Sequence, residues 1–124
     1  MDVTENTKRV AQQALDYLRM YPERHDQNNF VSWEDASVED LRHFTGQVNL
    51  CDTTMCVAGT VQWQQEGQIV LSAVDYAAGD YLGLDRYEWS SLFYDTNNEQ
   101  AIDMLTAIAN GDADKFHDLR RELL

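Results

Sequence analysis

Residues 49–67 of the chain read NLCDTTMCVAGTVQWQQEG, and this stretch predicts the central helix of the fold. Residues 52–54 read DTT, and each of these residue types can cap the first turn of a helix that begins near Met55. Apolar residues then recur at helical spacing, and Gly67 is a residue type that commonly ends a helix. The side chains of residues 58–60 are small, so a second helix is expected to approach closely there.

The same combination of capping residues and apolar stripes recurs along the rest of the chain. The expected helix starts are Thr4 or Thr7, Ser37, Ser72, Asp85, Thr96 and Asp112, and the expected ends are Tyr21, Gly46, Gly83 and Gly111. Asp85 with Glu88, and Thr96 with Glu99, form capping-box patterns directly before apolar residues. Only residues 69–71 suggest an extended segment, and no pairing partner for them is evident. The sequence therefore predicts an all-α fold of six or seven short helices, forming one compact domain over residues 1–124.

The charge of the chain is strongly acidic. Nine basic residues against 22 acidic ones give a net charge of −13. Between His43 and Asp114 the one basic residue is Arg86, against 11 acidic residues, so −10 of the −13 falls in this span. Such a surface repels nucleic-acid backbones and anionic membranes and favours basic partners. The alternative is that the acidic residues only keep the protein in solution.

Some acidic residues have an evident local role as helix caps, and others do not. The acidic residues without one are the predicted partner-binding residues Asp75, Asp80, Asp95 and Asp103. Trp63 lies in the polar run of residues 62–66, away from the apolar stripe of the central helix, and is the predicted exposed aromatic residue of the same interface. The other tryptophans and the tyrosines are expected in the core or at its rim.

The two cysteines allow three interpretations. A thiol at a helix start can have a lowered pKa and act as a nucleophile with one of the histidines His25, His43 or His117. Cys51 and Cys56 with His25 are alternatively the ligands of a small zinc site. The third interpretation, which the sequence favours, is that at least one cysteine is a buried, reduced core residue. No catalytic residue, cofactor or bound metal is therefore assigned.

The sequence also limits location and activity. No apolar run approaches the roughly 20 residues needed to cross a bilayer, and the first ten residues lack the apolar core of a signal peptide. A cytoplasmic protein is expected. Phosphate-binding loops, nucleotide fingerprints and metalloprotease motifs are not found in the sequence. The oligomeric state is left open.

Three groups of residues together resemble a known family. They are Pro22 to Gln27 with Trp33, then Cys51, Thr53, Cys56, Ala58 and Gly59, and then Ala78, Tyr81, Leu82, Gly83, Leu84, Leu92 and Phe93. This order is similar to small uncharacterised proteins of actinobacteria and their phages, whose middle motif often reads CGTxxCxAGW. The chain departs from that motif at Asp52 and Thr60. The resemblance implies a compact cytosolic domain and a phage or mobile-element origin, and it supplies no activity.

The function predicted from the sequence is a non-enzymatic, acidic protein-interaction module, encoded by a phage, that acts on a basic host protein such as a nucleic-acid-binding one. The first alternative is a zinc- or thiol-dependent domain that uses Cys51, Cys56 and His25. The second is a structural domain whose charge has no part in partner binding.

Overall fold

The structure is a computed structural model, and it describes residues 1–27, 32–33, 45–46 and 53–123. The predicted all-α fold is confirmed, because helices make up most of this part of the chain. The helices are α1 (Glu5–Met20), η1 (a 3₁₀-helix, Pro22–Arg24), α3 (Val57–Glu66), α4 (Val74–Tyr81), α5 (Arg86–Tyr94), α6 (Asn98–Ala109) and α7 (Ala113–Glu122). The strands are β1 (Ser32–Trp33), β2 (Thr45–Gly46), β3 (Thr53–Thr54) and β4 (Ile69–Val70).

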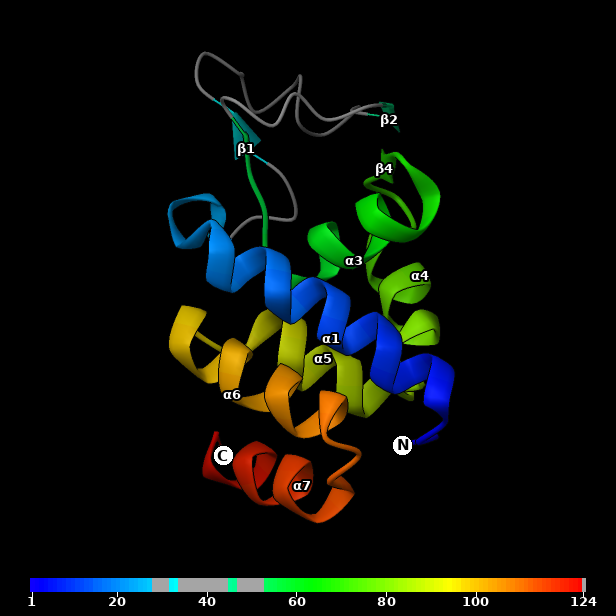
Figure 1. Cartoon of the computed structure of the whole chain (residues 1–124), viewed down its shortest axis with the longest axis vertical. Helices are drawn as coiled ribbons and strands as arrows, with labels where there is room; N and C mark the ends of the chain where they lie inside the picture. Colours follow the sequence, from blue (N-terminus) through cyan, green and yellow to red (C-terminus); the bar gives the residue numbers. More distant parts are fainter. Residues whose placement is uncertain (28–31, 34–44, 47–52, 124) are drawn as a thin grey trace.

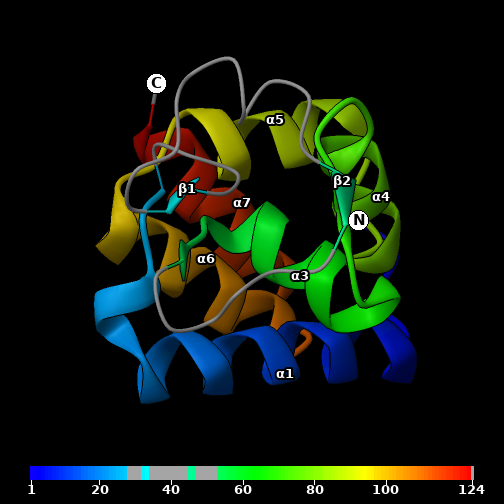
Figure 2. The same ribbon diagram turned by 90° about the horizontal axis from the view of Figure 1, so that it is seen from above.

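The helices pack around one apolar core. Helix α1 lies against α6 and α3, α4 lies against α3 and α5, and α7 covers α6 at one end of the molecule (Figure 1). Seen from above, α1 and α5 form opposite edges with α3 and α6 between them (Figure 2). Within the ranges that the structure describes, no helix combines the length and hydropathy needed to span a lipid bilayer.

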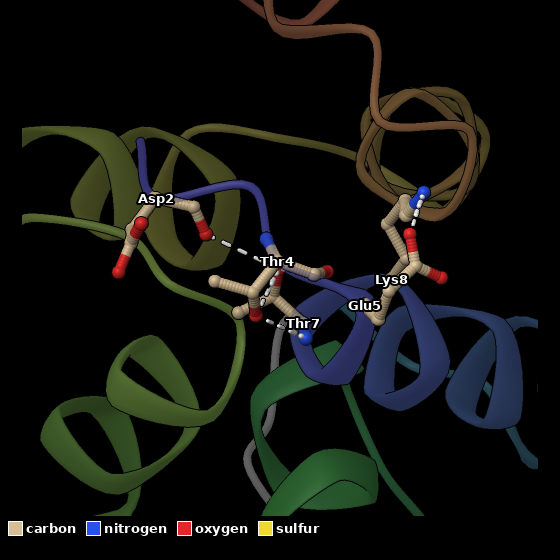
Figure 3. A network of polar contacts seen from close by, with 5 residues as sticks. All are labelled: Asp2, Thr4, Glu5, Thr7 and Lys8. Atoms are coloured by element: carbon tan, nitrogen blue, oxygen red, sulfur yellow. Dashed lines mark hydrogen bonds and ion pairs between the residues drawn. The ribbon is translucent and has the colours of Figure 1, made fainter.

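Helix α1 forms as the sequence predicts. Its apolar stripe is buried throughout, and the residues concerned are Val10, Ala11, Ala14, Leu15 and Leu18. Thr4 and Thr7 act together at its start, because each side-chain oxygen accepts a hydrogen bond from the other's backbone N–H, at 3.1 and 2.9 Å (Figure 3). Glu5 and Lys8 form an ion pair on the same turn. The helix stops before Pro22, since the residue that precedes a proline avoids the helical conformation.

The central helix α3 begins two residues later than predicted. Its N-cap is Cys56, whose sulfur lies 3.5 Å from the backbone nitrogen of Gly59. The chain stays extended before this point because β3 pairs with β1 and because Met55 exchanges backbone hydrogen bonds with Arg24 and Asp26. The predicted end is confirmed, since Gly67 takes the left-handed conformation with φ 74°.

The extended segment after α3 has a partner that the sequence did not reveal. Strand β4 pairs antiparallel with β2, with Ile69 opposite Gly46. The predicted helix that ends at Gly46 is therefore wrong at its last two residues, which belong to β2. Its other residues, 37–44, lie outside the described ranges.

The helix starts in the second half follow capping chemistry, with two changes of position. The capping box of Asp85 with Glu88 and the cap at Asp112 are confirmed.

Helix α6 is capped by Asn97 with Gln100, one residue later than predicted. The reason is that the buried Thr96 hydroxyl donates to the carbonyl of Leu92 at 2.6 Å. Helix α4 has Ala73 at its N-cap instead of Ser72, and no side chain among the described residues caps it.

A buried glutamine joins four segments of the fold. The side chain of Gln27 donates from Nε2 to the carbonyl oxygen of Leu92 at 3.0 Å. Its Oε1 accepts from the backbone N–H of Val57 at 3.1 Å and lies 2.9 Å from Nε2 of His25. Asn98 completes the connection, because it accepts from the backbone N–H of Gln27 and donates to the carbonyl of His25. The segment after η1 is thereby tied to the start of α3, the end of α5 and the start of α6.

Replacing this glutamine tests its role. Gln27→Met keeps the approximate length of the side chain but leaves the Val57 N–H without its partner and removes the contact to His25 Nε2. The Leu92 carbonyl loses one of its two donors and keeps the Thr96 hydroxyl. The free energy of unfolding from urea titration is expected to fall by about 2–4 kcal/mol. Gln12→Met is the control, because Gln12 lies on the exposed surface of α1 and bonds only Asp16 among the described contacts; a change within about 0.5 kcal/mol is expected there. An equal loss of unfolding free energy in the two variants would contradict the role of Gln27 in joining the helix ends.

Candidate functional site

The candidate site begins with a close contact between α4 and α5. A tight turn joins the two helices, with Gly83 at φ 70° and the backbone N–H of Leu84 bonded to the carbonyl of Gly79 at 2.9 Å. Trp89 packs against the bare backbone of Gly79, where a Cβ atom would lie 2.3 Å from the indole Cδ1. The indole ring therefore sits directly on α4, and Trp89 is buried.

Three further aromatic rings surround Trp89. The ring of Tyr76 meets it edge-on with centroids 5.2 Å apart, and the rings of Phe93 and Tyr94 lie at 6.1 and 6.4 Å. Phe93 is buried, whereas Tyr76 is 55% exposed and Tyr94 56% exposed. The two tyrosine rings are thus held against a rigid base and still face the solvent.

Asp75 links the hydroxyl of Tyr94 to the backbone of α4. Its Oδ2 accepts from the hydroxyl of Tyr94 at 2.6 Å, and its Oδ1 accepts from the backbone N–H of Tyr76 at 2.8 Å. Burial, and then the hydrogen bond to Asp75, raise the pKa of Tyr94, so its hydroxyl remains a donor at neutral pH. The sequence showed no local role for Asp75 as a helix cap, and the structure adds one that depends on distant residues, because the carboxylate links α4 to α5.

Two more of the predicted acidic residues are on the same two helices. Asp80 follows Tyr76 by four residues in α4, which places both on one side of that helix, and its side chain is exposed. Asp95 follows Tyr94 at the end of α5 and is also exposed. We call Asp75, Tyr76, Asp80, Tyr94 and Asp95 the acidic aromatic face.

The fourth predicted acidic residue lies elsewhere. Asp103 is on α6, where it lines a surface groove of about 380 Å³ together with Leu18 and Pro22. It also borders a groove with Lys115 of α7. Figure 1 shows α6 and α4 on opposite sides of the molecule. The structure therefore brings three of the four predicted residues to one pair of helices and leaves Asp103 apart.

Trp63 is not the exposed aromatic residue that the sequence predicts. It is partly buried and packs against the core, with its ring centroid 5.2 Å from that of Tyr17. The exposed aromatic residues of the described chain are Tyr76, Tyr87 and Tyr94. Tyr76 was recognisable in the sequence, because it falls between the buried positions 74 and 78 of its helix.

Cys56 and His25 are both buried. Burial raises the pKa of the Cys56 thiol to about 12, and this outweighs the lowering by the backbone N–H of Gly59. Burial also lowers the pKa of His25, whose Nε2 faces Gln27. Cys56 is thus a protonated core thiol rather than an activated nucleophile. Cys51 lies outside the described ranges, and no group of three metal-ligating side chains is found within them.

A second buried carboxylate belongs to the packing of the helices. Glu88 accepts from the backbone N–H of Asp85 at 3.0 Å, and its two oxygens lie 3.0 Å from the amino nitrogen of Met1 and 3.5 Å from Nε2 of His117. The Glu88 backbone N–H, which bonds Asp85, is the largest cause of the lowered pKa of that aspartate. These contacts join the start of the chain, α5 and α7, so we assign Glu88 a structural role.

Comparisons of the chain with protein-family models, curated proteins and solved structures find no match. The resemblance to actinobacterial and phage proteins stays a prediction. The assignment of the site therefore depends on geometry and charge.

The contact between Gly79 and Trp89 can be tested by a double-mutant cycle. Gly79→Ala is expected to lower the free energy of unfolding, because overpacking costs about 1–3 kcal/mol and the gain in helix propensity returns about 1 kcal/mol. In a Trp89→Leu background the same substitution is expected to be neutral or stabilising, since the ring is gone. Urea denaturation of the four proteins measures the coupling. The same cost in both backgrounds would contradict this contact.

The burial of Cys56 can be tested with a thiol reagent. In a Cys51→Ser variant at pH 8, a pKa of about 12 leaves about one in ten thousand of the Cys56 thiol ionised. Labelling by an aromatic disulfide reagent is expected to be slow in the native protein and rapid and stoichiometric in urea. Rapid labelling of the native protein would restore the thiol interpretation.

Proposed function

We propose that the chain is a non-enzymatic protein-interaction module that binds a basic protein through the acidic aromatic face. The observation that carries this proposal is the exposure of Tyr76 and Tyr94, both of which pack on the buried Trp89. The Asp75 carboxylate accepts from the Tyr94 hydroxyl, Asp80 lies one turn after Tyr76 on α4, and the exposed Asp95 follows Tyr94 in the chain.

The physical chemistry of this face suits binding to a basic surface. Tyrosine is over-represented among the residues that dominate binding energy, and it offers a large contact area with few rotatable bonds. The hydrogen bond from Tyr94 to Asp75 already fixes one ring, so binding loses less conformational freedom there. The acidic residues attract a basic partner over long range and speed its association.

The expected setting of this interaction comes from the sequence. A net charge of −13 disfavours direct binding to nucleic acids or anionic membranes, so the partner is proposed to be a protein. The resemblance to phage proteins supports a host protein in the cytoplasm as the target, including one that itself binds nucleic acid through a basic surface.

The proposal is tested by neutralising two exposed acidic residues of the face. Asp80→Asn with Asp95→Asn is expected to weaken binding to a partner captured from host lysate, mainly through a slower association rate. Asp114→Asn with Asp118→Asn is the control, because it removes the same charge from exposed positions on α7. Surface plasmon resonance at rising salt concentrations measures both rates.

We expect the first variant to lose at least about tenfold in affinity at low salt and the control to lose much less. Wild-type association is expected to slow steeply as salt rises. Binding that is insensitive to salt and equal in the two variants would contradict the proposal.

A further inference from the structure

The acidic aromatic face holds one carboxylate in a fixed orientation. Each oxygen of Asp75 accepts one hydrogen bond from within the chain, at 2.6 Å from Tyr94 and 2.8 Å from Tyr76. An ionised carboxylate has about four lone-pair positions, so both oxygens keep capacity for a further donor. The two internal bonds come from different helices and keep the carboxylate from rotating.

This carboxylate has the Tyr94 side chain beside it and no ion-pair partner among the described residues. The ion pairs found there are those of Glu88, of Lys8 with Glu5 and of Arg121 with Asp118. Asp75 is half-buried, and the rings of Tyr76 and Tyr94 are more than half exposed. A cation that reaches Asp75 therefore meets the Tyr94 ring, and the Tyr76 ring packs on the same Trp89 ring as Tyr94.

We propose that this site binds an arginine side chain of the basic partner. The guanidinium group is planar and can donate two parallel hydrogen bonds to a carboxylate while its face stacks on an aromatic ring. A lysine ammonium group is a strongly hydrated point charge that cannot form this combination of contacts. The inference depends on the proposed function and adds to it the residue type that Asp75, Tyr76 and Tyr94 select.

The chain contains a matched control position. Tyr87 is 76% exposed and lies on α5 like Tyr94, yet its ring makes no ring contact with the aromatic cluster around Trp89 and no hydrogen bond to Asp75 among the described contacts. Loss of the Tyr87 ring removes an exposed tyrosine without altering the proposed arginine site.

The experiment compares hexa-arginine and hexa-lysine peptides by isothermal titration calorimetry with the full chain at one ionic strength. Wild type is expected to bind the arginine peptide at least about fivefold more tightly. Tyr76→Leu and Asp75→Asn are expected to remove most of this preference, whereas Tyr87→Leu retains it. Tyr94→Phe keeps the ring but removes the hydrogen bond to Asp75, so it is expected to reduce the arginine preference in part. Circular dichroism melts identify any variant that is unfolded.

Equal affinity of wild type for the two peptides would overturn the inference. The same conclusion follows if the arginine preference survives in both Tyr76→Leu and Asp75→Asn, or if Tyr87→Leu removes it equally. These outcomes do not contradict the proposed function if binding of the captured partner still depends on Asp80 and Asp95. If capture is indifferent to those two residues, the proposed function itself is wrong.

Discussion

The hydrogen bonds of Gln27 are the interaction on which the arrangement of the helices depends. One side chain accepts from the first residue of α3 and donates to the Leu92 carbonyl near the end of α5, while its backbone is held by Asn98 at the start of α6. Each of these groups is at or near a helix end, where backbone groups lack partners within the helix. Because Gln27 is buried, its loss would leave the Val57 N–H at the start of α3 unsatisfied inside the core. Gln27 thereby links the end of α5 to the starts of α3 and α6.

Once α5 is held in place, the acidic aromatic face follows from local packing. Gly79 lets the Trp89 ring lie directly on α4, and the ring in turn supports Tyr76 and Tyr94. Asp75 then bridges the two helices at the surface. The face is therefore built on regular helices and not on a loop, which keeps its rings and carboxylate in a constant relation. Rigid placement of this kind favours binding, because little freedom is lost when a partner arrives.

Local features of the fold could be predicted from the sequence, and contacts between distant segments could not. Helix caps such as Asp85 and the apolar stripe of α1 depend on neighbouring residues, so they were correct or displaced by one or two positions. The start of α3 was misplaced because strand pairing with distant residues keeps the chain extended up to Cys56. The acidic residues of the candidate site were recognisable by charge, but the role of Asp75 and the separation of Asp103 depend on which helices meet. Trp63 was misjudged because its ring packs against Tyr17 of α1.

The central claim is that the chain meets its partner through the acidic aromatic face. Hydroxyl-radical footprinting of the full chain, alone and with the captured partner, tests it directly, because tyrosine and methionine side chains report their own exposure. Met20, which is 70% exposed on α1, is the internal reference. The account predicts that oxidation of Tyr76 and Tyr94 falls severalfold in the complex while that of Met20 is unchanged. Protection of Met20 with Tyr76 and Tyr94 oxidised as in the free protein would contradict it.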